Sequence, residues 1–255
     1  MEQVNEITGL ERQQVGLAQT QGRDFRTDAI RRLVADRIQP GTVLDVGCGN
    51  GGLVAWLLER GYDARGIDLS GPIAEAAQEA LRACGLDPTR IRQASVESLV
   101  EHSELADNIV SMDCLEHIED DAAAFASLVS GVRPGGRLII TVPAMPSVFG
   151  EKDRTVGHYR RYTRERLEAL TEGHPLRVEE LRYWNLLGVA PTFIAVRVFD
   201  RAVDDSFRYG NPGLAKRVLR GGLSAWFRNV ENRIQPPLGL TLLMVATVLD
   251  GSEKA

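Results

Sequence analysis

The residues best suited to chemistry begin with a glycine-rich segment, VLDVGCGNG, at residues 43–51. Apolar β-formers surround the acidic Asp45, and Gly47, Gly49 and Gly51 follow. Because glycine lacks a Cβ atom, this run lets the backbone turn sharply and approach a ligand closely. The next residues, GGLVAWLLERG, carry apolar side chains at helical spacing. The segment therefore predicts a buried strand, a tight turn and a helix N-terminus that faces a nucleotide-like ligand.

The glycine pattern by itself does not name the ligand. Gly47, Gly49 and Gly52 also satisfy GxGxxG, the dinucleotide-binding pattern, and a merely tight turn is the simpler alternative. Asp68 closes the next apolar segment, where a carboxylate can accept both hydroxyls of a ribose, although it could instead cap the following helix. A nicotinamide-dependent oxidoreductase shares these features, but no Tyr-x-x-x-Lys pair follows.

A second chemical segment, FGEKDRTVGHYRRYTRERL, spans residues 149–167. His158 is the first candidate for a general base, because an imidazole titrates near neutral pH. His117, which follows another apolar segment, is the second, although it could simply cap the next helix. Arg160 and Arg161 could bind an anionic acceptor, or they could belong to a scaffold in which an arginine pairs with an aspartate.

Regular alternation of short apolar strands and amphipathic helices must position these residues. It predicts an α/β fold with a doubly wound, mostly parallel sheet. The expected strands are 42–46, 62–69, 90–95, 108–115, 137–143, 176–185 and 240–248. Such folds bind ligands at the carboxyl ends of their strands, so the segments above should meet at one edge.

We expect the chain to form a single domain over residues 1–255, which includes two further segments. Residues 1–40 form a lead-in with a helix at about 24–38. Residues 188–237 look helical and are too long for a plain connection, so we expect a cap or an interface there. The aromatic side chains of this region could close over a lipophilic molecule, or they could form a packed subdomain or the face of a homodimer. They are Trp184, Phe193, Phe199, Phe207, Trp226 and Phe227.

The composition of the chain disfavours several classes of binding partner. The chain has 255 residues, 44% of them hydrophobic, and a net charge of −5, which disfavours a broad nucleic-acid footprint. Its three cysteines are far apart, so we expect a reducing, cytoplasmic environment and no zinc-like metal site. The longest apolar stretches, 186–196 and 238–249, are shorter than the roughly 20 residues of a membrane span.

Four landmarks, in order, resemble those of the class I S-adenosylmethionine-dependent methyltransferases. They are DVGCGNG, GIDLS, MDCLEHI and VRPGGRLIITVP. The resemblance covers residues 24–185 well and the rest more weakly. It implies a seven-stranded sheet of order 3-2-1-4-5-7-6 with strand seven antiparallel, and S-adenosylmethionine as the cofactor.

The resemblance also implies cofactor contacts. Asp45 would orient the loop or pair with the cationic amine, Asp68 would bind the ribose, and Leu69 would pack on adenine. The full set is Arg26, Asp45, Gly47, Gly49, Asp68, Leu69, Ser95, Val96, Met112 and Asp113.

One of these contacts departs from the family pattern, and another has an equally expected structural role. Ser95 stands where the family has an acidic residue near the adenine amine, which leaves Ser95, the Val96 backbone or Glu97 for that contact. Arg26 resembles an arginine that binds the cofactor's carboxylate, but an exposed helix arginine is equally expected.

The acceptor side resembles a subgroup of small-molecule methyltransferases with D-x(4)-H-x-RRYT after strand five. His158 and His117 are the candidate catalytic residues, for the reasons given above. The expected substrate contacts are Phe149, Tyr159, Arg161 and Tyr162. In the alternative, Arg161 pairs with Asp153 and Tyr162 lies in the core.

The predicted function is methyl transfer from S-adenosylmethionine to a small molecule in secondary metabolism. O-methylation is the first expectation and C- or N-methylation the next. No NPPY-like motif is present, which disfavours amide or adenine amine acceptors. The rivals are a nicotinamide-dependent oxidoreductase and a non-catalytic, cofactor-binding partner subunit.

Overall fold

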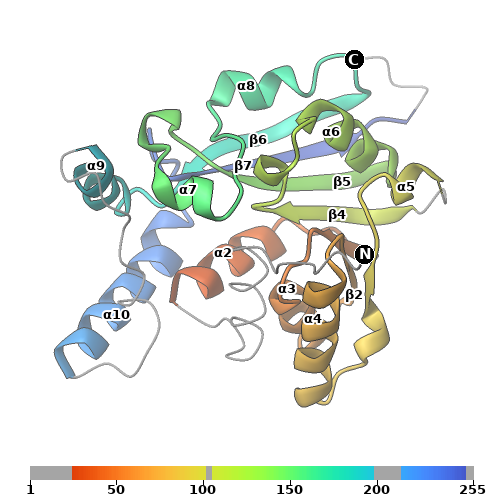
Figure 1. Ribbon diagram of the computed structural model, residues 1–255, viewed down its shortest axis with the longest axis horizontal. Coiled ribbons are helices and arrows are strands. Elements are labelled where there is room, and N and C mark those ends of the chain that lie inside the picture. The colour runs from red at the N-terminus through yellow and green to blue at the C-terminus, as the bar shows by residue number, and fades with distance from the viewer. Residues whose placement is uncertain (1–24, 102–104, 198–213, 251–255) are drawn as a thin grey trace, which may run out of the picture.

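A seven-stranded sheet of order β3-β2-β1-β4-β5-β7-β6 forms the centre of the computed structural model, which describes residues 25–101, 105–197 and 214–250 (Figure 1). Strand β7 runs antiparallel to both of its neighbours, β5 and β6, so the predicted order and the predicted direction of the last strand are confirmed. The strands are β1 (Thr42–Val46), β2 (Asp63–Asp68), β3 (Ile91–Gln93), β4 (Ala106–Met112), β5 (Val132–Pro143), β6 (Leu176–Trp184) and β7 (Thr241–Val248).

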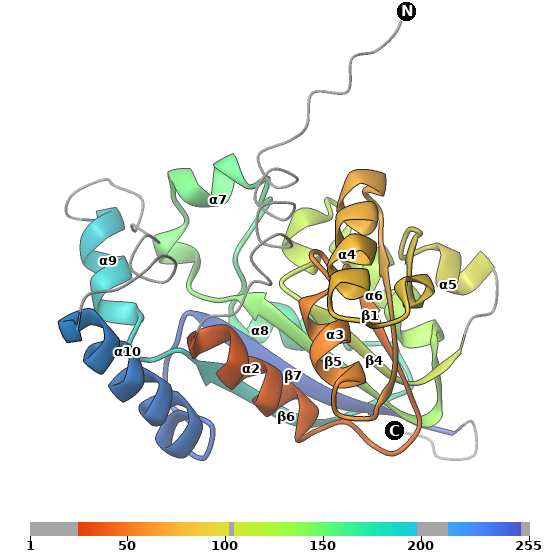
Figure 2. The same cartoon turned by 90° about the horizontal axis from the view of Figure 1, so that it is seen from below.

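Helices cover both faces of the sheet, as Figures 1 and 2 show. One face carries α2 (Phe25–Ala35), α3 (Gly52–Leu58) and α4 (Gly71–Ala83). The other carries α5 (Ser98–Glu101), α6 (Asp121–Ser130) and α8 (Arg164–Ala169). The remaining helices are α7 (Glu151–Thr155), α9 (Val189–Arg197) and α10 (Leu214–Trp226), with short turns η1 (Pro88–Arg90), η2 (Leu115–His117), η3 (Pro146–Val148) and the π-helix η5 (Phe227–Glu231).

The central strands are apolar because both of their faces are buried. In β5, Leu138 and Ile140 pack into the core beneath α6, whereas the intervening Ile139 packs into the core beneath α2 and α3. This is why continuous apolar runs, rather than alternating ones, mark the parallel strands in the sequence.

Two strand ends differ from the sequence prediction. We expected 133–136 to form a turn, but β5 already begins at Val132, which pairs with Ala106 before pairing resumes between Arg137 and Asn108. The predicted strand 108–115 ends at Met112, because Asp113 has a positive φ of 51°. That backbone conformation is uncommon for a residue other than glycine, and it lies at the functional edge of the sheet.

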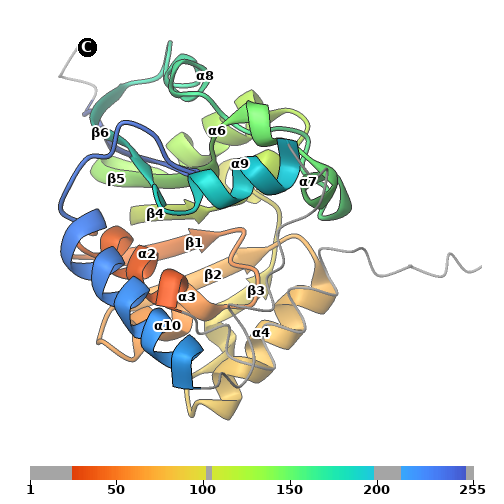
Figure 3. The ribbon, with the colours of Figure 1, turned by 90° about the vertical axis from the view of Figure 1, so that its left-hand side faces the viewer.

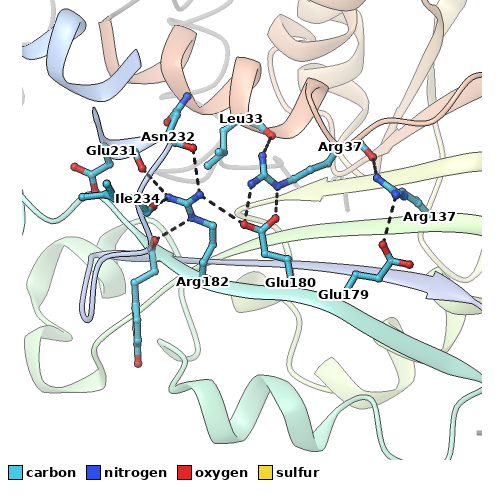
Figure 4. Close-up of polar contacts among 10 residues, drawn as sticks. Leu33, Arg37, Arg137, Glu179, Glu180, Arg182, Glu231, Asn232 and Ile234 are labelled. Carbon is cyan, nitrogen blue, oxygen red and sulfur yellow. Dashed lines mark hydrogen bonds and ion pairs between the residues drawn. The ribbon is translucent and has the colours of Figure 1, made fainter. Parts of the chain in front are cut away.

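A polar network joins the edge strand β6 to α2 and to η5 (Figure 4). Arg37 Nε donates to Glu180 Oε2 over 2.5 Å. The buried Arg182 guanidinium donates to the Glu231 carbonyl over 2.7 Å and to the carbonyls of Asn232 and Ile234. These bonds satisfy a buried charge and carbonyls at a helix end, and they fix the C-terminal segment on the fold.

The expected cap at 188–237 separates into two parts (Figure 3). Helix α9 lies beside η3, and Val196 would touch a Cβ added at Gly150. Helix α10 instead packs along α2. Trp184 is buried against Phe227, with ring centroids 4.9 Å apart, so these two aromatics belong to a packed core.

Some sequence expectations concern residues outside the described ranges. They include the start of the 1–40 lead-in and the cap aromatics Phe199 and Phe207. Within the described residues, no helix has the length and apolar character needed to cross a membrane.

Candidate active site

The glycine loop bends directly after β1 and contacts the segment that follows β4. Gly47 and Gly49 have φ angles of 73° and 52°, a region that favours glycine. A Cβ added at Gly47 would lie 2.8 Å from the Cβ of Cys114 and closer still to its sulfur. The loop therefore packs directly against the segment that leads to His117.

Asp68 joins this loop to the next helix. Its Oδ2 accepts a hydrogen bond from the Gly49 amide over 2.9 Å, and its Oδ1 accepts one from the Ser70 amide over 3.0 Å. Ser70, as predicted, caps α4 by accepting from the Ile73 amide. The neighbouring Leu69 is 71% exposed, so its apolar side chain is open to a ligand at this edge.

Asp45 is a buried carboxylate below the loop. It is 3% exposed, and its Oδ1 accepts no hydrogen bond from the described residues. Burial raises the pKa of Asp45 to about 7; the positive charge of Arg31 lowers that pKa, and the negative charge of Asp68 raises it further. A carboxylate in this state is suited to receiving a cation from a ligand.

The other predicted cofactor residues lie at the same edge or on α2. Ser95 is half-buried after β3, and its carbonyl accepts a 2.6 Å bond from the Ser98 hydroxyl. Met112 is half-buried at the end of β4. Asp113 is exposed and accepts a 3.3 Å bond from the Thr141 hydroxyl. Val96 is buried, and Arg26 is half-buried on α2.

On the acceptor side, Asp153 organises the loop after β5. Its Oδ1 lies 2.9 Å from His158 Nδ1 and accepts from Arg161, whose Nη2 is 2.8 Å away, while its Oδ2 accepts from the Gly150 amide. Burial opposes ionisation of Asp153, but the bonds from His158, Arg161 and Gly150 outweigh it and lower the pKa to about 2. Asp153 is therefore ionised and faces a protonated Nδ1 of His158; in the neutral form of that ring, Nε2 holds the lone pair.

His117 and Glu116 of η2 face His158. The two imidazoles meet edge to face with centroids 4.6 Å apart. Burial, and then the positive charge that His158 carries when protonated, lower the pKa of His117 to about 4. Burial also raises the pKa of Glu116 well above its usual range. The helix that follows is capped by Asp120, which accepts from the Ala123 amide, so His117 does not have the capping role considered for it.

The predicted substrate contacts divide into two groups. Phe149 is half-buried and Tyr159 is 54% exposed, so both can reach a ligand. Tyr162 is fully buried, and its hydroxyl donates to Asp121 over 2.9 Å. The substrate contact predicted for Tyr162 is therefore corrected to the alternative, a place in the core. Arg161 is held by Asp153, as that alternative also predicted.

Comparison with known proteins identifies the family of this chain. A family model described as a methyltransferase domain matches residues 18–185. The chain belongs to the class I S-adenosylmethionine-dependent methyltransferases. This excludes the oxidoreductase alternative, which the glycine loop alone left open.

The curated relatives match over a limited length. The methyltransferase is 36% identical over 100 residues to a "Ubiquinone biosynthesis O-methyltransferase" of Paracidovorax citrulli, covering 39% of this chain and 42% of the relative. It is 32% identical over 128 residues to the protein of that name from Aeromonas salmonicida, covering 49% and 51%. The match thus spans only about half or less of each relative.

Solved structures share the fold over most of the chain. A geranyl diphosphate C-methyltransferase of Streptomyces coelicolor has a TM-score of 0.58 at 13% identity, covering 88% of this chain and 79% of its own. A Haloferax volcanii protein solved with the Trm112 methyltransferase activator has a TM-score of 0.60 at 15% identity, covering 95% and 96%. At these identities the likeness shows the fold alone.

The residues at the edge fit S-adenosylmethionine. The buried, unpartnered oxygen of Asp45 matches the cofactor's cationic amine, and the left-handed glycines leave room for close approach. Sequence reasoning missed Arg31, a nearly buried arginine of α2 whose guanidinium lies beside Gly52. It also gave no role to Glu116, although LEH was one of its landmarks; nothing in the sequence shows that both carboxylate oxygens are buried.

Proposed function

We propose that this methyltransferase transfers the methyl group to a hydroxyl oxygen of a small-molecule acceptor, with carbon or nitrogen acceptors as the next candidates. The observation that carries the proposal is the pair of imidazoles, His117 and His158, next to the cofactor loop. A hydroxyl needs to lose its proton during transfer, and imidazoles suit that role. The names of the two curated relatives described above, both O-methyltransferases, agree with it.

The cofactor side rests on the loop and the two strands beside it. In this proposal Asp45 pairs with the amine, Asp68 accepts the ribose hydroxyls, and Leu69 covers the adenine. Bound S-adenosylmethionine supplies the methyl group and a thioether as leaving group. The full set of cofactor contacts is Arg26, Asp45, Gly47, Gly49, Asp68, Leu69, Ser95, Val96, Met112 and Asp113.

The acceptor side rests on the orientation of His158. Asp153 favours Nδ1 as the protonated nitrogen, so Nε2 of the neutral ring faces Glu116 and His117 with its lone pair. In this proposal the acceptor hydroxyl lies against that lone pair, with His117 as the second contact. Because proximity and orientation supply much of the rate in such a displacement, a fixed imidazole is of more use than a mobile one.

The acceptor is a lipophilic small molecule in this proposal. Phe149 and the exposed Tyr159 supply apolar surface, and α9 lies beside the same loop. Arg161 acts through Asp153 as a positioning residue, because its guanidinium is occupied by that carboxylate. Neither a nucleic acid nor a membrane span enters the proposal.

The names of the relatives, the free cysteines and the surface of α10 bear on the biological setting. We expect a role in natural-product or secondary metabolism, beside the ubiquinone biosynthesis for which the relatives are named. The free cysteines, Cys48, Cys84 and Cys114, fit a cytoplasmic protein. The exposed apolar side chains of α10, Val218 and Leu219, are a candidate face for a homodimer.

Turnover with labelled cofactor tests the proposal. The protein is incubated with methyl-labelled S-adenosylmethionine and, separately, hydroxylated aromatic compounds, amines and transfer RNA. Label in a hydroxylated compound supports the proposal. Cofactor binding without transfer to any acceptor would favour the non-catalytic partner subunit, and transfer to RNA alone would contradict the proposed acceptor class.

A further inference from the structure

Glu116 is an unusually placed carboxylate. It is fully buried, and neither of its oxygens accepts a hydrogen bond from the described residues. Its backbone carbonyl is occupied by the Tyr159 amide, 2.8 Å away, which fixes the residue in place. A buried carboxylate without hydrogen bonds costs several kcal/mol in its charged form, so these two oxygens are suited to a cation that comes from outside the chain.

Two imidazoles complete a compact donor set around this carboxylate. Glu116 Oε1 lies 3.9 Å from His158 Nε2. One donor atom from each of Glu116, His117 and His158 can be chosen so that all three lie within 4.8 Å of one another. Donor atoms bound at about 2.1 Å to one tetrahedral ion lie about 3.4 Å apart, so a small inward adjustment brings all three to bonding distance.

Asp153 holds His158 in the way that a carboxylate commonly holds a metal-binding histidine, through the ring nitrogen that does not bind the metal. Its carboxylate holds His158 through Nδ1 at 2.9 Å, which leaves Nε2 free to face the other two donors. A carboxylate behind a ligating histidine fixes the tautomer and the ring orientation and increases ligand basicity.

We propose that Glu116, His117 and His158 bind a divalent transition-metal ion of the Zn²⁺ or Mn²⁺ type. Two nitrogens and one carboxylate oxygen suit such ions better than Mg²⁺, which prefers oxygen ligands and keeps several waters. Three protein ligands leave at least one coordination position open, as in catalytic metal sites. The sequence predicted no metal site, because His158 lies far along the chain from the LEH segment and no zinc-like spacing marks the set.

The metal site itself rests on geometry alone. The role of the ion in methyl transfer rests on the proposed function, and it changes the role given to His158. With the ion bound, the acceptor hydroxyl occupies its open position, and the ion lowers the pKa of that hydroxyl. The hydroxyl proton leaves to water, the oxygen forms a bond to the methyl carbon, and the sulfur–methyl bond breaks to give a neutral thioether. His158 then acts on the acceptor through the ion rather than by taking the proton itself.

Metal binding is measured directly on the full chain after removal of metal with a chelator. Titration calorimetry with Zn²⁺ and with Mn²⁺ should give one ion per chain. Glu116→Gln and His158→Ala should each weaken binding at least tenfold, and Asp153→Asn should weaken it by about 10- to 100-fold, the usual effect of losing a carboxylate behind a ligand. The matched control is His174→Ala, because His174 packs on Phe125 outside the set.

Equal Zn²⁺ and Mn²⁺ binding by the wild type, Glu116→Gln and His158→Ala would overturn the site, as would a wild type that binds neither ion. Glu116→Gln keeps the side-chain volume and removes only the charge, so its circular dichroism and its affinity for S-adenosylhomocysteine should match the wild type. Metal binding without methyl transfer would leave the site standing and reject the proposed function. If the protein binds no metal and its methyl transfer is unchanged after chelator treatment, the metal site is rejected and the proposed function stands.

Discussion

The state of Asp45 predicts that cofactor binding is coupled to release of a proton. The carboxyl group is buried, and its pKa is raised to about 7, so a large fraction is neutral near neutral pH in the free protein. The cofactor's ammonium prefers the ionised form. Binding below about pH 7 must therefore expel the proton of Asp45.

The size of the effect on affinity follows from that pKa. At about pH 6 roughly a tenth of the Asp45 side chains are ionised, and at about pH 8 roughly nine tenths, so S-adenosylhomocysteine should bind about tenfold more weakly at the lower pH, or about 1.4 kcal/mol. Asp45→Asn cannot ionise. This variant should bind weakly at both pH values and lose the dependence.

The same carboxyl group should affect stability with a defined sign. Its folded pKa is raised from the ordinary 3.8 to about 7, so its favourable contribution is full below 3.8 and is lost as the pH rises through 7. The gap amounts to about 4 kcal/mol at about 1.36 kcal/mol per pKa unit. Without cofactor, Asp45→Asn should be more stable than the wild type at about pH 8 by up to that amount, and nearly equal to it at about pH 4.

Calorimetry in two buffers of different ionisation enthalpy measures the released proton, and urea unfolding measures the stability. An affinity that stays flat between about pH 6 and 8 in the wild type would refute the pairing of Asp45 with the cofactor amine. So would an Asp45→Asn variant that keeps the wild-type slope.

Four further substitutions separate ligand contacts from scaffold. Asp68→Ala should weaken S-adenosylhomocysteine binding by roughly 3 kcal/mol, from two lost bonds to a charged group, while circular dichroism shows a folded chain; wild-type affinity would remove its ribose role. His158→Ala should reduce turnover at least tenfold and leave cofactor affinity intact, and unchanged turnover would assign it to the scaffold. Gly47→Ala should weaken cofactor binding more than Gly61→Ala, because both have positive φ but only Gly47 has a neighbour in the way; equal calorimetric affinities would contradict this. Tyr162→Phe should lower the unfolding free energy by about 1–2 kcal/mol without changing KM for the acceptor, and a raised KM would restore the substrate contact.

The sequence was most informative where one local signal is repeated by its neighbours. Strand β1, its glycine loop and α3 could be predicted because the apolar run, the glycines and the helical spacing are contiguous in the chain. The order of the sheet followed from the resemblance, because those landmarks mark the ends of successive strands.

The acceptor side was only partly predictable, because it is made by long-range packing. His117 and His158 were both candidates, but nothing local shows that their rings meet or that the neighbouring Glu116 is fully buried. The substrate contact expected for Tyr162 came from the resemblance of the RRYT stretch to small-molecule methyltransferases; the hydroxyl of the buried Tyr162 instead donates to Asp121, which lies on a different element. Side-chain direction in an irregular loop has no periodic signal in the sequence.

The central claim is that the methyl group goes to an oxygen of a small molecule at the His117–His158 edge. It is tested most directly by NMR of the product formed from cofactor labelled with ¹³C in the methyl group, on an acceptor that carries both a hydroxyl and an amine. We expect the label as an O-methyl group, and its loss in His158→Ala. Label on nitrogen or carbon, or the same O-methyl yield from His158→Ala, would contradict the claim.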